Sequence, residues 1–439
     1  MPSYISSSAL FSLLVTAKNV LTPYHLTRCN EPYWKINNYS KGYPMYYSHR
    51  LTLVSTFVFS ITLSACGSGG VDSSTPEPEG IKPTANAGTD QEVVELDAVN
   101  LSGTLSTSNN SSDLTYLWRL VPPIESTSAS LSSSTDEKPS FEPDVGGIYT
   151  ATLVVNNGEA DSIEDSVKIT VLDQLTHNEA NDGHAYYNAS GTQIAFHSDR
   201  GDTGDFNIWV MDADGENLIQ ITNNLASDRR PHWSPDGSQI VFHSNRSGNE
   251  DLYIKNADGT GTATRITSNT NGDTHPYWHP TDATQVFYQS SRSGFRQIRT
   301  KTVGESGSMS LIAGDFNVGH PMLSHDGSKV AYGRNSIGGR NDIWVANIDG
   351  TDLTQLTNTP DIDEQHADWS PDDSQIAMRY VNLDNSSDIW LMDSDGSNKS
   401  QLTKSLADDR NPEWHPDGKS ILIRSNRTGN NELFRYPLE

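Results

Sequence analysis

The stretch Pro231-His232-Trp233-Ser234-Pro235-Asp236-Gly237-Ser238-Gln239-Ile240-Val241-Phe242 decides the fold, because related stretches occur six times between Gln174 and the C-terminus. Each copy holds one aromatic or apolar anchor, and successive anchors are 45 or 46 residues apart. Short apolar runs separated by Asp-Gly and Ser-x-Arg turns follow each anchor. A period of this length with four short strands per repeat is typical of a β-propeller blade, so the sequence predicts six blades. The anchors are Tyr187, Trp233, Trp278, Leu323, Trp369 and Trp414.

The two ends of the repeat region suggest how the ring closes. A Leu-Thr element ends most repeats, and its first copy, Leu175-Thr176, comes before the first anchor. The last repeat stops at Leu433-Phe434-Arg435-Tyr436 and lacks this element. We therefore expect Gln174 to Thr176 to supply the outer strand of the sixth blade, which would remove two exposed sheet edges. Trimming the last residues should then open the ring.

The charge of the chain limits its partners. The sequence has 30 basic and 56 acidic residues, a formal net charge of −26. A surface of this sign repels phosphate, so nucleic acid is not an expected partner. Cations and basic protein segments are the better candidates.

The N-terminal part contains a short apolar run from Leu51 to Leu63, which ends in Leu63-Ser64-Ala65-Cys66-Gly67. The run is too short to span a bilayer and is typical of a signal peptide. Its end resembles the lipobox of bacterial lipoproteins, which implies lipidation of Cys66 and a lipid anchor, with Gly67 favouring the outer membrane. We interpret 1–44 as over-extended translation before Met45, 45–65 as signal peptide and 66–82 as lipidated cysteine and flexible linker. An ordinary cleaved signal with a coincidental cysteine is the alternative.

Residues 83–172 have a different pattern. Short alternating strands around a single tryptophan, Trp118, predict a small β-sandwich. The phrases Pro83 to Asp90, Leu114 to Leu120 and Pro143 to Tyr149 resemble the PKD family, an immunoglobulin-like module. The resemblance implies that Trp118 lies in the core and Tyr149 on a late strand. We expect the domain to act as a spacer or adhesion module.

Residues 173–439 carry the phrases Pro-x-Trp-Ser-Pro-Asp-Gly, Ser-x-Arg and Asp-Ile-Trp-x-Met-x-x-Asp-Gly, which resemble the TolB-type propeller. The predicted fold class is therefore all-β: a six-bladed propeller preceded by an immunoglobulin-like (PKD-like) sandwich. The TolB family binds a peptide segment of a lipoprotein at its propeller channel. The resemblance implies a protein or peptide partner in the cell envelope, on its periplasmic or its outer side.

The best candidate site lies at two positions that vary between the repeats. Because they are two residues apart on an extended chain, we expect both side chains on the same side, as two stacked rings around the channel mouth. Three residues before the anchors stand His184, Arg230, His275, His320, His366 and Asn411. Five before them stand Asp182, Asp228, Asp273, Val318, Glu364 and Asp409.

Three interpretations of this site are open. The polar residues could only cap strands and bond to neighbouring blades. They could bind a cation, such as calcium or a transition metal, or a peptide. They could also be catalytic, with His275, His320 and His366 as ligands of a divalent metal, an arrangement similar to that of oligogalacturonate lyases acting on acidic polysaccharide. We predict binding rather than catalysis and assign no catalytic residue.

Other polar residues carry less weight in the sequence. His197 and His243 each follow a phenylalanine on a second strand and are expected to be surface or satisfied residues. The arginines of the Ser-x-Arg turns are expected to pair with carboxylates or carbonyls between blades. These are Arg200, Arg246, Arg292 and Arg427.

Overall fold

The structure is a computed structural model that describes residues 82–201, 204–292, 294–314, 316–335 and 339–438, and three short N-terminal strands. These strands, β1 (Ile5–Ser6), β2 (His25–Arg28) and β3 (Tyr33–Asn37), form one antiparallel sheet in the order β1-β3-β2. The predicted signal peptide, the start at Met45 and the lipidated Cys66 lie outside the described residues. Within the described residues, no helix has the length and hydrophobicity needed to cross a membrane.

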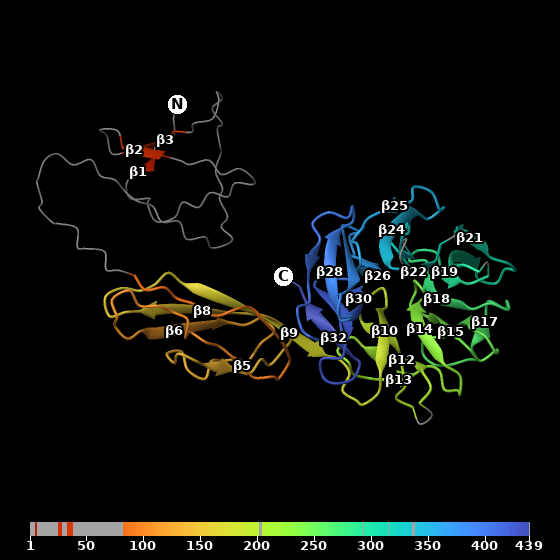
Figure 1. The fold of residues 1–439 in the computed structure, drawn as a ribbon, viewed down its shortest axis with the longest axis horizontal. Coiled ribbons are helices and arrows are strands. Elements are labelled where there is room, and N and C mark those ends of the chain that lie inside the picture. Colours follow the sequence, from red (N-terminus) through yellow and green to blue (C-terminus); the bar gives the residue numbers. More distant parts are fainter. Residues whose placement is uncertain are drawn as a thin grey trace, which may run out of the picture. The chain divides into compact units, whose positions relative to one another are not determined.

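The residues after the linker first form a small β-sandwich (Figure 1). Strand β8 pairs with β6 and β9, β4 runs parallel to β9, and β5 pairs with β7. Trp118 is 2% exposed and packs in the same core as Tyr149 of β8, so the expected places of both residues are confirmed. The strands are β4 (Gln91–Val94), β5 (Val99–Asn100), β6 (Thr115–Val121), β7 (Ser140–Phe141), β8 (Gly147–Asn156) and β9 (Asp165–Gln174).

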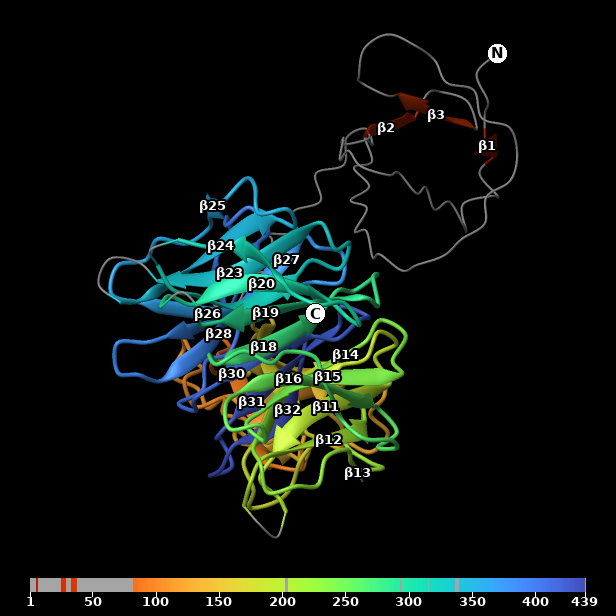
Figure 2. The ribbon, with the colours of Figure 1, turned by 90° about the vertical axis from the view of Figure 1, so that its right-hand side faces the viewer.

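Five of the repeats each form a separate four-stranded antiparallel sheet, the blades of a β-propeller (Figures 1 and 2). The first two blades are β10 (Asp182–Tyr187), β11 (Gln193–Ser198), β12 (Asn207–Asp212), β13 (Ile219–Gln220) and β14 (Asp228–Trp233), β15 (Gln239–Ser244), β16 (Asp251–Asn256), β17 (Thr264–Arg265). The third and fourth are β18 (Asp273–Trp278), β19 (Gln285–Ser290), β20 (Gln297–Thr302), β21 (Met309–Ile312) and β22 (Val318–Leu323), β23 (Lys329–Asn335), β24 (Asn341–Asn347), β25 (Thr354–Gln355). The fifth is β26 (Asp363–Trp369), β27 (Gln375–Val381), β28 (Ser387–Asp393), β29 (Ser400–Gln401).

The last repeat departs from this plan. Its three strands, β30 (Arg410–Trp414), β31 (Ser420–Ser425) and β32 (Glu432–Pro437), join β9 in a sheet of seven strands that continues into the sandwich. The prediction of six separate blades is therefore wrong: five stand alone, and the sixth repeat shares its sheet with the upstream domain. The reason is that β9 is ten residues long and pairs with β8 along most of its length before it reaches β32.

The segment around Gln174 still provides the neighbour of β32, as the repeat phase suggested. Phe434 lies opposite Gln174, and the Leu175 N–H donates a 2.8 Å hydrogen bond to the Leu433 carbonyl oxygen. Innermost strand β30 contacts β10 of the first blade and β26 of the fifth. The two ends of the repeat region therefore meet. The expected domain boundary at residue 172 falls inside β9.

Two of the anchor tryptophans form hydrogen bonds between neighbouring blades. Trp233 and Trp369 are nearly fully buried, and each indole N–H donates to a carbonyl oxygen of the preceding blade: Trp233 to Tyr186 at 2.9 Å and Trp369 to Met322 at 3.2 Å. All six anchors are buried, whereas the Trp278 indole donates to Ala283 of its own repeat, so burial is the property that the anchors share.

Candidate functional site

Every innermost strand carries a β-bulge at the candidate ring position. The pairing register shifts between the second and fifth residue of strands such as β10 and β14, and a corresponding shift occurs in the other four. All six ring residues have a positive φ, a backbone conformation that a non-glycine residue adopts at a cost of about 1–2 kcal/mol. The φ values are 44° at His184, 55° at Arg230, 53° at His275, 56° at His320, 50° at His366 and 53° at Asn411.

These bulges bring the ring residues of different blades together in the channel. The imidazole of His320 lies between two neighbours, with ring centroids 4.4 Å from His275 and 3.8 Å from His366. The ring centroids of His184 and His366 are 5.4 Å apart. The Arg230 guanidinium comes within 3.4 Å of His184 Nδ1. The predicted ring of imidazoles therefore exists as a packed cluster.

Above the cluster, a cavity of about 350 Å³ opens at one end of the channel. Its walls combine ring residues with second-strand residues and loop residues. Only one carboxylate, that of Asp182, lies among them. The lining residues are Asn181, Asp182, His184, His197, Phe206, Arg229, Arg230, His320, Gln365, His366, Arg379, Arg410, Asn411 and Arg424.

The predicted carboxylates do not form a second ring around this opening. The bulge interrupts the alternation of side chains, and each carboxylate, including Asp182, is at most 1% exposed and forms an ion pair with a cation of its own blade. Four of these cations are the Ser-x-Arg arginines, so these pairs form within blades rather than between them. The N–O distances are 2.7 Å for Asp182–Arg200 and Asp228–Arg246, 2.8 Å for Asp273–Arg292, 3.1 Å for Asp409–Arg427 and 2.9 Å for Glu364–Lys399.

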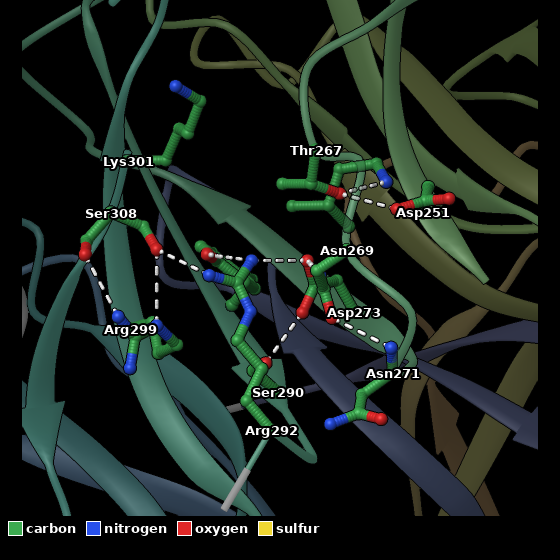
Figure 3. A network of polar contacts seen from close by, with 12 residues as sticks. Asp251, Thr267, Asn269, Asn271, Asp273, Ser290, Arg292, Arg299, Lys301 and Ser308 are labelled. Atoms are coloured by element: carbon green, nitrogen blue, oxygen red, sulfur yellow. Dashed lines mark hydrogen bonds and ion pairs between the residues drawn. The ribbon is translucent and has the colours of Figure 1, made fainter. Parts of the chain in front are cut away.

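Figure 3 shows one of these pairs in the third blade. The Asp273 carboxylate accepts hydrogen bonds from Arg292 at 2.8 Å and from the Ser290 hydroxyl at 2.6 Å. Asn269 donates to the same carboxylate. With its oxygens occupied in this way, Asp273 has little capacity left for a ligand, and its function is to join the loop before β18 to the turn after β19.

Burial and the nearby guanidinium keep the imidazoles neutral. Burial, followed by the positive charge of Arg230, holds the pKa of His184, His275 and His320 well below the usual range. At His366 burial has the largest effect on the pKa and His320 the next, in the same direction. Burial also lowers the pKa of Arg230 to about 10. At neutral pH the cluster therefore offers neutral imidazoles beside charged guanidiniums.

The three histidines proposed as metal ligands lie beside one another, with an edge-on contact between His275 and His320 and a tilted contact between His320 and His366. Among the described residues, no group of three histidine, cysteine or acidic side chains has an arrangement that could hold a metal ion. No described residue forms a hydrogen bond with either ring nitrogen of His366 or with His275 Nε2. Of these two residues, only His366 lines the cavity, and its ring nitrogens are buried.

Sequence reasoning missed several of the cavity residues. His197 lines the cavity and stacks on His184 with centroids 5.2 Å apart, and its Nδ1 accepts a hydrogen bond from the Arg230 N–H at 3.3 Å, so it is buried and satisfied rather than on the surface. His243 is also buried and lies 6.2 Å from His275. The missed signal is a second variable position, ten or eleven residues after each anchor on the second strand. There the repeats carry His197, His243, Gln289, Gly333, Arg379 and Arg424.

A third variable position, directly before each anchor, lies deeper in the channel. Its side chains bond between blades: the Trp414 N–H donates to Asp368 at 2.7 Å, and the Trp278 N–H to His232 at 3.2 Å. Burial raises the pKa of Asp368 and of Glu413. The position is occupied by Tyr186, His232, Tyr277, Met322, Asp368 and Glu413.

Comparison with known protein families gives a match in each domain. Residues 201–263 and 320–439 match the model of the TolB β-propeller domain, and residues 87–171 match the model of a PKD domain. A search of curated protein sequences finds no match.

Solved structures share the propeller fold. A protein assigned as TolB from Agrobacterium tumefaciens is 17% identical, with a TM-score of 0.50, over 60% of this chain and 93% of its own. TolB from Acinetobacter baumannii is 14% identical, with a TM-score of 0.43, over 67% of this chain and 77% of its own. Oligogalacturonate lyase from Vibrio parahaemolyticus is 11% identical, with a TM-score of 0.45, over 75% of this chain and 98% of its own. The two family matches show a PKD-type domain followed by a TolB-like β-propeller.

Proposed function

We propose that this chain is a cell-envelope lipoprotein whose propeller binds a segment of a partner protein in the cavity at the channel mouth. The observation that carries the proposal is the cavity itself, which is lined by polar side chains from five of the six bulges. Each bulge costs conformational energy that packing alone does not require. Such strain is most often retained where it positions side chains for a ligand.

The rim of the cavity favours a protein over a small solute. Leu225 is 79% exposed and Leu406 is fully exposed, in the loops that lead into the cavity ends of β14 and β30. Leu383, 77% exposed, lies in the turn after β27, four residues beyond the cavity residue Arg379. Exposed apolar side chains in the loops next to cavity-lining strands are the kind of contact that a covering protein uses.

Selection of displayed random octapeptides on the full chain in detergent tests this function. We expect enrichment on the wild type and none on Gln365→Trp, which places an indole in the cavity. The matched control is Gln355→Trp on the exposed outer strand β25, which should enrich the same peptides. An equal unfolding midpoint of the two variants shows that both are folded. Enrichment that survives Gln365→Trp would contradict the proposal.

The envelope location rests on the lipobox-like sequence at Cys66. We expect the mature N-terminus to be a lipid-modified Cys66, and mass spectrometry of the purified protein measures this directly. Cys66→Ala should release the protein from the membrane fraction. An unmodified N-terminus at another residue would favour the ordinary cleaved signal.

The lyase alternative makes a different prediction, which a metal titration checks. If His275, His320 and His366 bind a divalent metal, manganese should raise the unfolding midpoint of the wild type but not of the triple alanine variant. We expect equal midpoints with and without manganese, because these imidazoles do not form an arrangement that could hold a metal ion among the described residues. A shift confined to the wild type would restore the enzyme interpretation.

A further inference from the structure

We infer that the segment bound in the cavity is acidic, with carboxylates that meet the cavity arginines. This inference rests on the proposed function and names the chemistry of its ligand. It also reverses the sequence-based expectation of an acidic site for a cation or a basic peptide. Five arginines line the cavity against the single carboxylate of Asp182. The chain as a whole has a net charge of −26, so the positive charge of this cavity is opposite in sign to that of the whole chain.

The cavity arginines differ from the structural arginines in their partners. Asp182 is already paired with Arg200 at 2.7 Å, and Arg410 is paired with Asp408. Among the described residues, no carboxylate forms an ion pair with the remaining four guanidiniums. These belong to Arg229, Arg230, Arg379 and Arg424.

Guanidiniums without an ion pair in a partly closed cavity have less compensation for their buried charge than ion-paired ones. Burial lowers the pKa of Arg379 to about 10, and it lowers the pKa of Arg424 as well. No described residue accepts a hydrogen bond from the Nε atoms of Arg410 and Arg424. A ligand carboxylate would supply both the missing acceptor and the missing charge, in the bidentate geometry that guanidinium favours.

The positive charges are gathered on one side of the opening. Arg379, Arg410 and Arg424 come from the fifth and sixth repeats, and Arg229 and Arg230 from the second. The matching positions of the fourth repeat are glycines, Gly319 and Gly333, and those of the third are uncharged. The repeats around the first blade therefore receive the acidic part of the ligand.

Charge and rim together point to an acidic peptide rather than another polyanion. The guanidiniums would bind the carboxylates of aspartate, glutamate or a chain terminus equally well. The exposed Leu225, Leu383 and Leu406 add apolar contacts that a sugar polymer or inorganic anion does not match. A peptide with acidic and apolar residues fits both features.

The octapeptide selection also tests this inference, because its sequences report the ligand class. We expect enrichment of aspartate and glutamate over the input, together with apolar residues. Synthetic peptides from the selection should bind at least about tenfold more weakly after Glu→Gln replacement. Arg379→Gln with Arg424→Gln should weaken the acidic peptides by a similar factor. Arg119→Gln on β6 of the sandwich is the matched control and should leave binding unchanged.

A salt titration on the wild type keeps the inference testable if the double variant does not fold. The affinity for the acidic peptide should fall between about 50 mM and about 500 mM salt, whereas a neutral analogue should respond little. Enrichment without acidic residues would overturn the inference and leave the proposed function standing. No enrichment at all would overturn both. Binding of oligogalacturonate but no acidic peptide, with the same dependence on arginine, would overturn the assignment to a peptide.

Discussion

Arg230 of the second blade holds its guanidinium 3.4 Å from Nδ1 of His184 in the first blade. The backbone N–H of Arg230 also donates to Nδ1 of His197 at 3.3 Å. A positive charge between two imidazoles favours their neutral form, because a second charge would be repelled inside a low-dielectric cavity. The joint between the first two blades is therefore sensitive to the protonation of histidine.

Stability should fall in mild acid because of this histidine cluster. The pKa of His184 and His366 is lowered in the folded state, so below about pH 6.5 the unfolded chain binds more protons than the folded chain. Each such histidine removes up to about 1.4 kcal/mol of unfolding free energy per pH unit. Urea unfolding at pH 7 and pH 5 measures the loss. His184→Gln with His366→Gln should make the dependence shallower, and an unchanged slope would contradict this account.

The buried pair Asp368 and Glu413 should act in the opposite direction. Burial raises the pKa of both carboxyl groups, so between the unfolded pKa of about 4 and the higher folded pKa the folded chain binds more protons. Their contribution is full at low pH and is lost as the pH rises. Asp368→Asn should therefore stabilise the fold at pH 8 by about 1–2 kcal/mol and have little effect at pH 4. Asparagine can still accept the Trp414 N–H, and destabilisation at pH 8 would refute the assignment.

The strained backbone of the ring predicts a difference between glycine and alanine. At His275, where φ is 53°, both substitutions remove the imidazole, but only glycine adopts this conformation without cost. His275→Gly should be more stable than His275→Ala by about 1 kcal/mol in urea unfolding. The control variant is Ala367→Gly. Ala367 has no positive φ, so this substitution should destabilise the fold. Equal stability of the two His275 variants would show that the bulge relaxes.

The ion pairs behind the ring should be structural. Arg292→Met leaves the Asp273 carboxylate buried without its cation, and we expect a loss of about 3–5 kcal/mol in unfolding free energy. Adding Asp273→Asn to this variant should recover part of the loss, since no uncompensated charge remains. A double-mutant cycle by chemical denaturation measures the coupling, and additive effects would be inconsistent with a buried pair.

Removal of β32 should open the ring. Phe434 is fully buried, and Gln174 is paired directly opposite it. Deleting 432–439 exposes the edge of β9 and the core of the last repeat, at a cost of about 3 kcal/mol or more. Deleting Glu439 alone is the control and should leave the midpoint of thermal unfolding unchanged. Retention of the wild-type midpoint by the longer deletion would show that closure does not depend on β32.

The propeller could be predicted from the repeat because the anchor residues are buried and the turn residues form turns in the same places of each copy. The anchors are buried in every copy of the phrase, so their spacing reports the strand order directly. The candidate ring of His184 to Asn411 was also found from the repeat, at the positions where it varies. The sequence does not show that β9 pairs both with β8 of the sandwich and with β32 of the last repeat, because pairing of distant strands leaves no local pattern.

The charge of the site could not be predicted for a related reason. Period-two alternation places Asp228 and Arg230 on one side, but the bulge turns Arg230 into the channel and leaves Asp228 behind it with Arg246. A bulge depends on the partner strand and has no reliable signature in a single chain. The arginines of β27 and β31 were overlooked because only innermost strands were considered.

The shared strand β9 has a consequence for how such genes can be rearranged. The PKD match ends at residue 171, yet the strand continues to Gln174 and reaches β32 through its last two residues. A recombination junction placed between the two domains would cut β9, and the propeller would lose the strand that pairs with β32. An exchange of the upstream domain succeeds only if the incoming module ends in a strand that continues into Asp173 and Gln174. The two domains would therefore have to be exchanged together, although each resembles a family of its own.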